Sequence, residues 1–315
     1  MAYFFPHRHL LDVEQLSMAD ITAIIDLASA YAAQNRSAGK KTDKLAGRTV
    51  VNMFLESSTR TRTSFEIAAK RLGADVVNFN AALSSLNKGE TLLDTMRVLD
   101  SMQVDAIVIR HQENGAPEFV SRHVAASVLN AGDGSNAHPT QALLDALTVK
   151  NRKGRLENLT IAICGDVEHS RVARSGIRLF KKFGAEIRIF SPPQFLPKDL
   201  DALGVKAFPT MSSALRDADI VLMLRIQNER LAEGELDMTV EEYHRLYGLD
   251  HAKLGAAKPD VVVIHPLPMN RGVEITDELA DDPKYCAFFE QVEMGVAVRM
   301  ACLDLLLTGN ERWKR

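Results

Sequence analysis

The sequence predicts an α/β protein with two doubly wound domains, each built on a mainly parallel sheet flanked by helices. The chain has 315 residues, which corresponds to about two domains at roughly 150 residues each. Amphipathic helical segments alternate with short β-branched runs from end to end, the usual pattern of parallel sheets. The apolar runs form two groups of four, at 49–55, 74–79, 104–109 and 126–130, and at 159–164, 186–190, 219–224 and 260–264. Two groups favour two sheets over one closed barrel.

The first helix is predicted to begin at Ser17, with Asp20 three positions later as an approximate capping box. Apolar residues then recur at helical spacing, at Ile21, Ile24, Ile25 and Ala28. The last helix is predicted over about 288–307, where apolar residues stand three or four positions apart, at Val292, Val296, Met300 and Leu303.

The domain boundary is predicted near 146–156. A helix that begins around Pro139 ends there in the polar run 150–155, whose Gly154 is a C-terminal helix signal. We therefore expect a first domain over 1–148 and a second over 149–288. The C-terminal segment 289–315 could pack on either domain, and we expect it to return to the first.

Composition and charge exclude several classes of protein. The net charge is −3 and the isoelectric point about 6.3, which argues against a nonspecific nucleic-acid binder. No apolar run reaches the roughly 18 residues of a membrane helix. The N-terminal residues also lack the charged and apolar regions of a secretory signal, so we expect a cytoplasmic protein that does not act at a membrane.

Cysteine and histidine usage predicts neither disulfides nor a metal site. Cys164, Cys286 and Cys302 stand far apart inside apolar stretches, as reduced core thiols in a cytosol do. The nine histidines form no metal-ligand cluster with each other or with cysteine, so we expect no structural zinc.

Polar residues follow most of the predicted strands. In open α/β sheets, ligands bind beyond the carboxyl ends of the strands, so these positions are the candidate site. The segments are 56–63, 110–111, 134–141, 165–171, 225–227 and 265–268. Four of these six place an arginine at or near the strand end, which predicts an anionic ligand.

The segment from Ser58 to Thr63 carries the sharpest signal. Helical apolar spacing follows it, with Gly73 as the C-terminal signal, so this run of hydroxyls and arginines falls on the first turn of a helix. Backbone N–H groups and the positive end of the helix dipole make such a turn an anion site. Four hydroxyls and two arginines within six residues exceed what capping requires, which favours a phosphate over an ordinary N-cap.

Two further segments point to a site beyond the strand ends. His138 precedes Pro139 at a helix start, where it would cap the helix with its imidazole in the cleft. Pro266-Leu267-Pro268 follows a strand directly, and one of its X-Pro bonds could be cis. A Walker A motif and the Gly-x-Gly-x-x-Gly fingerprint are both absent, so a phosphorylated small molecule is favoured over an NTP or a dinucleotide.

Together these segments resemble the aspartate/ornithine carbamoyltransferase family. Ser58-Thr59-Arg60-Thr61-Arg62 resembles its carbamoyl-phosphate signature, and His138-Pro139-Thr140-Gln141 its second anchor. Further matches are the segment 85–91, Arg110-His111, Arg171, Arg225-Ile226-Gln227 and His265-Pro266-Leu267-Pro268. They occur in register over nearly the whole chain, so the resemblance implies a carbamoyltransferase with no cofactor and no metal.

Within that family, the sequence is more similar to members that use aspartate than to those that use ornithine. Ornithine enzymes carry Cys where this chain has Pro266, and their Ser-Met-Gly loop is absent here. The resemblance therefore implies that carbamoyl phosphate and L-aspartate yield N-carbamoyl-L-aspartate and phosphate, in de novo pyrimidine biosynthesis. Carbamoylation of another amino acid such as ornithine stays open, whereas a silent scaffold homologue and a Rossmann oxidoreductase are disfavoured.

The resemblance also implies a role for each residue at the carbamoyl-phosphate side. Ser58, Thr59, Arg60 and Thr61 would hold the phosphate, and Arg110 would bridge the phosphate and the carbonyl oxygen. Thr61, Arg110 and His138 would surround that oxygen as negative charge develops on it. Gln141 and the backbone of Leu267 and Pro268 would orient the carbamoyl amide.

At the aspartate side, the resemblance implies that Arg171, Arg225 and Gln227 hold the second substrate. Ser85 and Lys88 would reach in from the neighbouring subunit of a homotrimer with shared active sites, with Ser84 as the alternative serine. Glu56 would join the domains in a closed state through Arg171 and Arg230. The sequence leaves open whether trimers stand alone or join regulatory or dihydroorotase-like partner chains.

Overall fold

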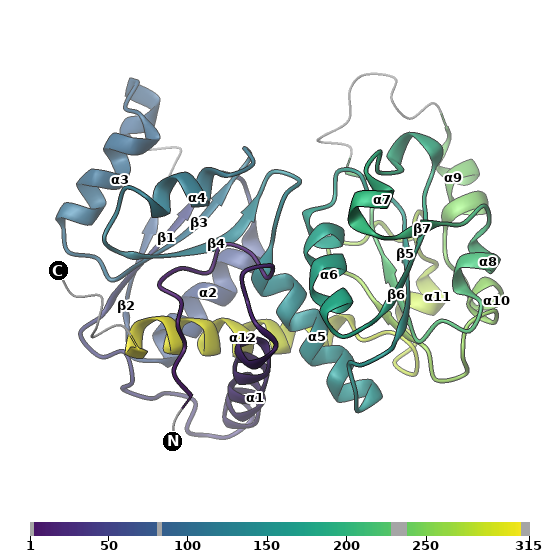
Figure 1. The fold of residues 1–315 in the computed structure, drawn as a ribbon, viewed down its shortest axis with the longest axis horizontal. Coiled ribbons are helices and arrows are strands. Elements are labelled where there is room, and N and C mark those ends of the chain that lie inside the picture. Colours follow the sequence, from purple (N-terminus) through teal and green to yellow (C-terminus); the bar gives the residue numbers. More distant parts are fainter. Residues whose placement is uncertain (1–2, 81–83, 228–237, 310–315) are drawn as a thin grey trace. The chain divides into compact units, whose positions relative to one another are not determined.

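The computed structural model describes residues 3–80, 84–227 and 238–309 (Figure 1). Residue contacts divide the chain into two units, Met1–Leu147 with Glu293–Arg315, and Thr148–Val292. Each unit contains a parallel sheet with helices on both faces, which confirms the predicted fold class.

The first unit is built on a four-stranded parallel sheet in the order β2-β1-β3-β4. Its helix α2 lies on one face and α3 and α4 on the other, where Met96 and Val120 pack with Met53, Ile107 and Val128 of the strands (Figure 1). The elements are α1 (Met18–Asn35), β1 (Thr49–Phe54), α2 (Thr59–Arg71), β2 (Asp75–Phe79), η2 (Ser85–Lys88), α3 (Leu92–Ser101), β3 (Ala106–His111), α4 (Ala116–Ser121) and β4 (Ser127–Asp133). Two helices belong to both units, α5 (Pro139–Lys153) and α12 (Phe288–Thr308).

This strand order creates a topological switch point between β1 and β3. From β1 the chain crosses to β2 through α2, and from β2 it returns past β1 to β3 through α3. Right-handed crossovers in opposite directions place the connecting helices on opposite faces and leave a crevice beyond the two strand ends. The segments that follow β1 and end β3 therefore lie side by side at this edge.

The predicted start of α1 is confirmed in detail. The Ser17 hydroxyl accepts from the Asp20 backbone N–H, and the Asp20 carboxylate accepts from the Ser17 backbone N–H, the reciprocal pattern of a capping box. Asp20 is buried and also accepts from the Tyr3 hydroxyl at 2.5 Å, while His7 Nε2 lies 3.0 Å away. The carboxylate thus ties the N-terminal segment to the helix.

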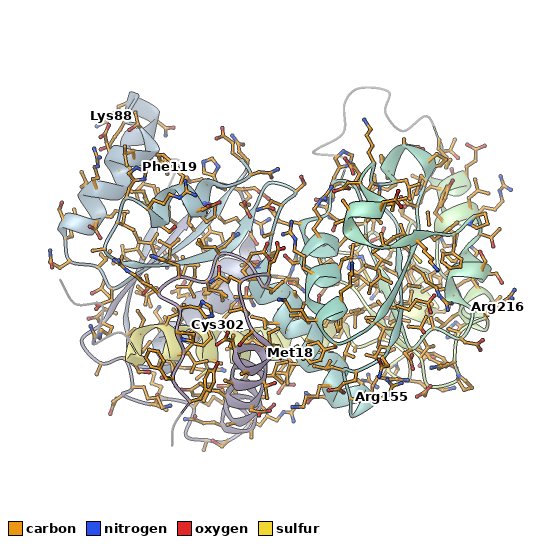
Figure 2. All side chains as sticks on the ribbon, viewed as in Figure 1. Met18, Lys88, Phe119, Arg155, Arg216 and Cys302 are labelled. Atoms are coloured by element: carbon orange, nitrogen blue, oxygen red, sulfur yellow. The ribbon has the colours of Figure 1, made fainter. Side chains whose placement is uncertain are left out.

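Helix α12 begins and ends close to the predicted bounds, and its C-terminal part packs within the first unit. The Tyr31 hydroxyl of α1 donates to Asp304 at 2.5 Å, and Lys44 pairs with the same carboxylate at 2.7 Å. The Arg299 guanidinium lies 5.1 Å from the centre of the Phe65 ring of α2. Cys302 marks the helix in Figure 2.

The second unit has a five-stranded parallel sheet in the order β7-β6-β5-β8-β9. Helix α6 lies on one face, and on the other Met211, Leu215 and Leu254 pack against Val221 and Val263 (Figure 1). The elements are β5 (Thr160–Cys164), α6 (Arg171–Lys182), β6 (Glu186–Phe190), η3 (Pro193–Phe195), α7 (Leu200–Leu203), β7 (Lys206–Ala207), α8 (Met211–Leu215), β8 (Ile220–Met223), α9 (Val240–Tyr247), α10 (His251–Leu254), β9 (Val262–Ile264) and α11 (Asp277–Ala280).

The edge strand β7 is absent from the sequence prediction, which placed four strands in this half. The strand is only two residues long, and both residues are exposed, so it has neither an apolar run nor an alternating pattern. Short edge strands of this kind are set by pairing with their neighbour, here β6, rather than by their own composition.

The three cysteines are buried free thiols, as predicted. Burial raises the pKa of each to about 12, so none is an activated nucleophile at neutral pH. Within residues 3–80, 84–227 and 238–309, none of the helices combines the length and the apolar character that crossing a bilayer requires.

Candidate functional site

At the switch point of the first unit, β1 leads through a short turn into the first turn of α2. The helix begins at Thr59, as predicted, and Ser58 stands at its N-cap with extended backbone angles. The Ser58 hydroxyl makes no capping hydrogen bond, so the first turn keeps backbone donors for a ligand. Thr61 is buried, whereas Thr59 and Arg60 are exposed.

Arg110 enters the same edge from β3. Its backbone pairs with Phe54 of β1, and the register with β4 shifts between Ile109 and His111, an irregularity of the kind that redirects a side chain. The guanidinium donates to Glu56 Oε1 at 2.7 Å and to the Ala131 carbonyl at 3.4 Å. The structure therefore brings together two of the predicted site residues, Glu56 and Arg110.

His138 and Gln141 reach this edge through the loop after β4. Asp133 is buried and organises the loop, because its carboxylate accepts from the backbone N–H of Gly115 at 2.7 Å and of Ala137 at 3.2 Å. His138 directly precedes α5 and is buried, and its carbonyl accepts from the Gln141 N–H. The Gln141 amide nitrogen donates to Asp145 Oδ1 at 2.9 Å, one helical turn further on.

The segment predicted to serve a neighbouring subunit forms the short helix η2, directly before α3. Lys88 is exposed at its end (Figure 2). The Ser84 carbonyl accepts from the Asn87 N–H at 3.2 Å, and the backbone of Ser85 begins η2.

The second unit has its own switch point, between β5 and β8. Gly165 follows β5 with a φ of +114°, and a Cβ atom there would lie 2.2 Å from the Leu224 carbonyl oxygen. Only glycine allows this close approach of the two chain segments. Beyond it, Arg171 is the first residue of α6 and is buried, and the Ser170 hydroxyl caps the helix.

Arg225 and Gln227 follow β8 at the same edge of this sheet. The Arg225 guanidinium donates to the Ile226 carbonyl at 3.0 Å, and Gln227 donates through its amide to the His169 carbonyl at 3.0 Å. The buried Asp166 carboxylate accepts from the Gln227 N–H at 3.3 Å. The structure thus brings the segments of Arg171 and Gln227 together within one unit, whereas Arg230 lies outside the described residues.

The proline-bounded loop after β9 contains a cis bond between Leu267 and Pro268, as the sequence allowed. His265 is buried and accepts from the Leu267 N–H at 2.9 Å through Nδ1. Its Nε2 lies 3.2 Å from Glu274 Oε1, and the same carboxylate oxygen accepts from the Asn270 N–H at 2.6 Å. This network fixes the backbone of Leu267 and Pro268.

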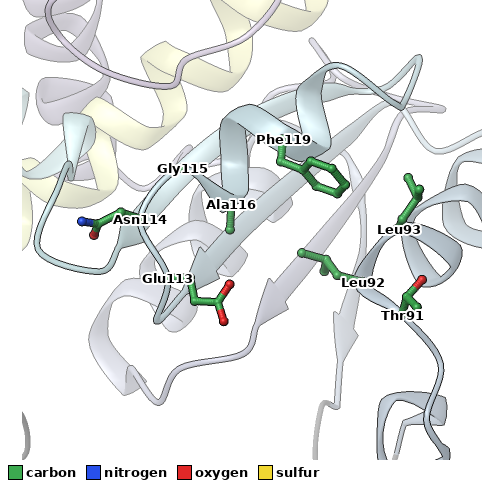
Figure 3. Close-up of a pocket in the computed structure, with 8 residues that line it drawn as sticks. All are labelled: Thr91, Leu92, Leu93, Glu113, Asn114, Gly115, Ala116 and Phe119. Carbon is green, nitrogen blue, oxygen red and sulfur yellow. The ribbon is translucent and has the colours of Figure 1, made fainter.

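A separate cavity of about 430 Å³ opens in the first unit between the N-terminal ends of α3 and α4 (Figure 3). Its lining residues are Thr91, Leu92, Leu93, Glu113, Asn114, Gly115, Ala116 and Phe119. None of them is a predicted catalytic or binding residue. The cavity also lacks a cationic side chain, so the strand ends fit an anionic ligand better.

Sequence reasoning missed the acidic residues that hold the site loops. Asp133, Asp166 and Glu274 are buried and accept from loop backbone or side-chain groups. An aspartate directly at a strand end before a polar loop was an available signal for the first two. Asp145 was also readable, since it stands four positions after Gln141 on one helix face.

The fold and these two edges define a two-domain α/β protein with polar and cationic side chains at the switch point of each sheet. Residues 8–151 match the carbamoyl-P binding domain of aspartate/ornithine carbamoyltransferases, and residues 157–306 match their Asp/Orn binding domain. The chain belongs to the aspartate/ornithine carbamoyltransferase family, which confirms the resemblance seen in the sequence.

Individual relatives agree with this assignment. The chain is similar to the aspartate carbamoyltransferase catalytic subunit of Rhodospirillum centenum, with 56% identity over 97% of this chain and 96% of that one. Its fold is similar to that of aspartate transcarbamoylase from Trypanosoma cruzi in complex with carbamoyl phosphate and aspartate, with a TM-score of 0.85, 35% identity, and coverage of 95% and 96%. The ornithine carbamoyltransferase from Pyrococcus furiosus gives 0.83 at 28% identity, with coverage of 95% and 97%.

Proposed function

We propose that this protein is an enzyme that transfers the carbamoyl group of carbamoyl phosphate to the amine of L-aspartate. The products are N-carbamoyl-L-aspartate and phosphate, and the step belongs to de novo pyrimidine biosynthesis. The observation that carries the proposal is the edge between β1 and β3, where the hydroxyl-rich start of α2 and Arg110 lie beside each other. Relatives at 56% identity named aspartate carbamoyltransferase catalytic subunit support aspartate over ornithine.

Carbamoyl phosphate is assigned to residues 1–148. Ser58, Thr59, Arg60 and Thr61 hold the phosphate through backbone and side-chain donors at the helix N-terminus. Thr61, Arg110 and His138 donate to the carbonyl oxygen. The carbamoyl amide faces Gln141 and the backbone of Leu267 and Pro268, which the His265 network supports from the second unit.

Aspartate is assigned to residues 149–288. Its two carboxylates suit the planar forks of Arg171 and Arg225, and Gln227 supplies an amide. The buried position of Arg171 at the start of α6 supports this role, because an anion there gains from both the guanidinium and the helix dipole. The segment 289–315 returns to the first domain, as its contacts with α1 and α2 support.

Glu56 couples phosphate binding to domain closure. In this structure its carboxylate holds the Arg110 guanidinium at 2.7 Å. The phosphate competes for the same guanidinium, so substrate binding releases Glu56 to pair with Arg171 and Arg230 in a closed state.

The reaction is a direct transfer. The neutral aspartate amine attacks the carbonyl carbon, negative charge develops on the carbonyl oxygen, and phosphate leaves as it accepts the amine proton. Preorganised donors at that oxygen and alignment of the two substrates lower the barrier. The buried thiols, whose pKa burial raises to about 12, support a route without a cysteine nucleophile.

The enzyme acts as a homotrimer in the cytoplasm, with Ser85 and Lys88 completing the site of a neighbouring subunit. The exposed position of Lys88 at the end of η2 supports this, since its ammonium can reach a partner (Figure 2). Regulatory or dihydroorotase-like chains would join such trimers through surfaces outside the active site.

A colorimetric carbamoyl-amino-acid assay tests the function. The purified protein, given carbamoyl phosphate and aspartate, should form carbamoyl-aspartate and phosphate in equal amounts, with little product from ornithine. Faster carbamoylation of ornithine would transfer the assignment to the other branch of the family. Phosphate release that does not depend on an amino acid would contradict the carbamoyl transfer itself.

A further inference from the structure

We propose that Asp145 and Arg299 are positioning residues that fix which end of the Gln141 amide faces the carbamoyl group of the substrate. The inference rests on the proposed function, because it assigns the partner of Gln141 as the substrate's NH₂ group.

The first step is the orientation of the Gln141 side chain. Gln141 and Asp145 lie one turn apart on α5, and Gln141 Nε2 donates to Asp145 Oδ1 at 2.9 Å. An ionised carboxylate only accepts hydrogen bonds, so the amide nitrogen must face Asp145. The Gln141 carbonyl oxygen is then the end left to accept from a ligand. The NH₂ of a carbamoyl group donates, so this orientation matches it and the reverse orientation does not.

The second step concerns the charged group that lies near Asp145, a residue that is only 1% exposed. Arg299 on α12 is 4% exposed, and its guanidinium lies against α5 beside Asp145. A Cβ atom placed on Gly295 would lie 2.7 Å from Arg299 Nη1 and 3.2 Å from the side chain of Leu144, the residue before Asp145. Burial lowers the pKa of the Arg299 guanidinium to about 10, so the guanidinium stays charged at neutral pH. A buried cation favours the ionised form of a nearby carboxyl.

The position of Arg299 links Asp145 to the phosphate side. Its guanidinium packs 5.1 Å from the Phe65 ring centre, and Phe65 belongs to α2, the helix whose first turn carries the hydroxyl and arginine run. Arg299 therefore lies between α5, which carries Gln141, and α2, whose first turn is proposed to hold the phosphate.

Burying the Arg299 guanidinium costs free energy that packing alone does not require. Its Nε atom is buried without a hydrogen-bond partner in the described part of the chain. An apolar residue of similar volume often replaces a buried ionic group with no loss of stability. A buried polar group that lacks a hydrogen-bond partner is tolerated mainly near functional sites.

The experiment compares three ligands that differ at one group. Carbamoyl phosphate carries NH₂, acetyl phosphate carries a methyl group in its place, and inorganic phosphate has neither. Dissociation constants are measured for the wild type, Asp145→Asn, Arg299→Met and the double variant, together with their unfolding midpoints. Asn at 145 can donate or accept, so it no longer dictates the orientation of Gln141.

We expect each single variant to lose about tenfold of the preference for carbamoyl phosphate over acetyl phosphate, the effect of one hydrogen bond. Inorganic phosphate should bind with nearly wild-type affinity. Because both residues are proposed to act through the orientation of Gln141, the double variant should lose no more than the larger single loss. Arg299→Lys, which keeps the charge, should retain most of the preference.

Equal weakening of all three ligands would overturn the proposal in favour of a purely structural role, and so would an unchanged preference in variants that are folded. Glu293→Gln is the matched control, since it removes a surface ion pair from the same helix and should change none of the three constants. A wild type that fails to carbamoylate aspartate would contradict the proposed function. An active wild type with unchanged preference in the variants would contradict the positioning role alone.

Discussion

Single residues at the start of α2 divide the work of holding an anion. Thr61 is buried in the turn, while Arg60 is exposed beside it. Under the proposed function, the phosphate therefore gains a buried hydroxyl and an exposed cation from adjacent positions of one helix turn.

Replacing Arg60 with alanine should lower kcat/KM by about 10²–10³-fold, the scale seen when one donor to a developing charge is removed. The side chain is exposed, so the free energy of unfolding should change by no more than about 0.5 kcal/mol. Steady-state kinetics and thermal unfolding measure the two effects. Lys70→Ala, on the exposed last turn of the same helix, should leave kcat/KM unchanged. Near-normal turnover of Arg60→Ala would refute the phosphate assignment.

Residues with a local signature were predictable from the sequence, and those with a distant partner were not. The hydroxyls after β1 and the helical apolar spacing that follows them predicted the start of α2 and a candidate anion site there. Arg299 is one arginine inside an apolar helix, and the Phe65 ring against which it packs belongs to a helix near the other end of the chain. No spacing rule connects positions that only tertiary packing brings together.

At the scale of elements, α1 shows how one carboxylate can hold a helix start and a flanking segment. Burial alone would raise the pKa of Asp20, but hydrogen bonds from Tyr3, Ser17 and His7 lower it to about 2. The ordinary value is 3.8, so the ionised form is favoured in the folded protein.

This difference predicts a pH-dependent contribution to stability. With a folded-state pKa below the unfolded one, the stabilisation is fully present above about pH 4 and is lost as pH falls through about 2. Its size is about 2 kcal/mol. Asp20→Asn should therefore lower the free energy of unfolding at pH 7, and the gap to wild type should close in acid. Denaturant titrations at several pH values measure it, with Asp26→Asn, an exposed carboxylate on α1, as the control. A gap that stays constant from pH 7 to pH 2 would contradict this account.

The elements themselves were largely readable from periodicity. Eight of the nine described strands lie within or adjacent to predicted apolar runs, and α1, α2, α5 and α12 begin within a residue or two of their predicted starts. Strand β7 was missed because two exposed residues carry no pattern. The short helices α10 and α11 have only four residues each. Helix propensity alone does not predict a single turn of this length.

At the scale of the whole molecule, the proposed shared site predicts complementation between inactive variants. Lys88→Ala and Arg60→Ala chains are each expected to be nearly inactive alone. In a mixed trimer, a site that takes Arg60 from one chain and Lys88 from its neighbour is intact. Random assembly at equal amounts should restore about a quarter of the sites, as the trimer's symmetry dictates.

Co-expression with two affinity tags isolates the mixed trimers, in which about one site in three should be intact because the homotrimers are removed. Mixing Arg60→Ala with Arg110→Ala is the matched control, since both residues come from the same side of the site and no intact site can form. Mixed Arg60→Ala and Lys88→Ala oligomers without recovered activity would place the whole site within one chain.

The return of α12 to the first unit also has a consequence for biosynthesis. Unit one consists of Met1–Leu147 and Glu293–Arg315, so its two pieces leave the ribosome separated by the entire second unit. At usual rates of translation that interval is on the order of ten seconds. Throughout it, Tyr31, Phe65 and Lys44 lack the contacts that α12 later provides. Until α12 is made, the N-terminal half therefore stays incompletely packed, in a form that chaperones can recognise. The second unit is contiguous in sequence and can fold first.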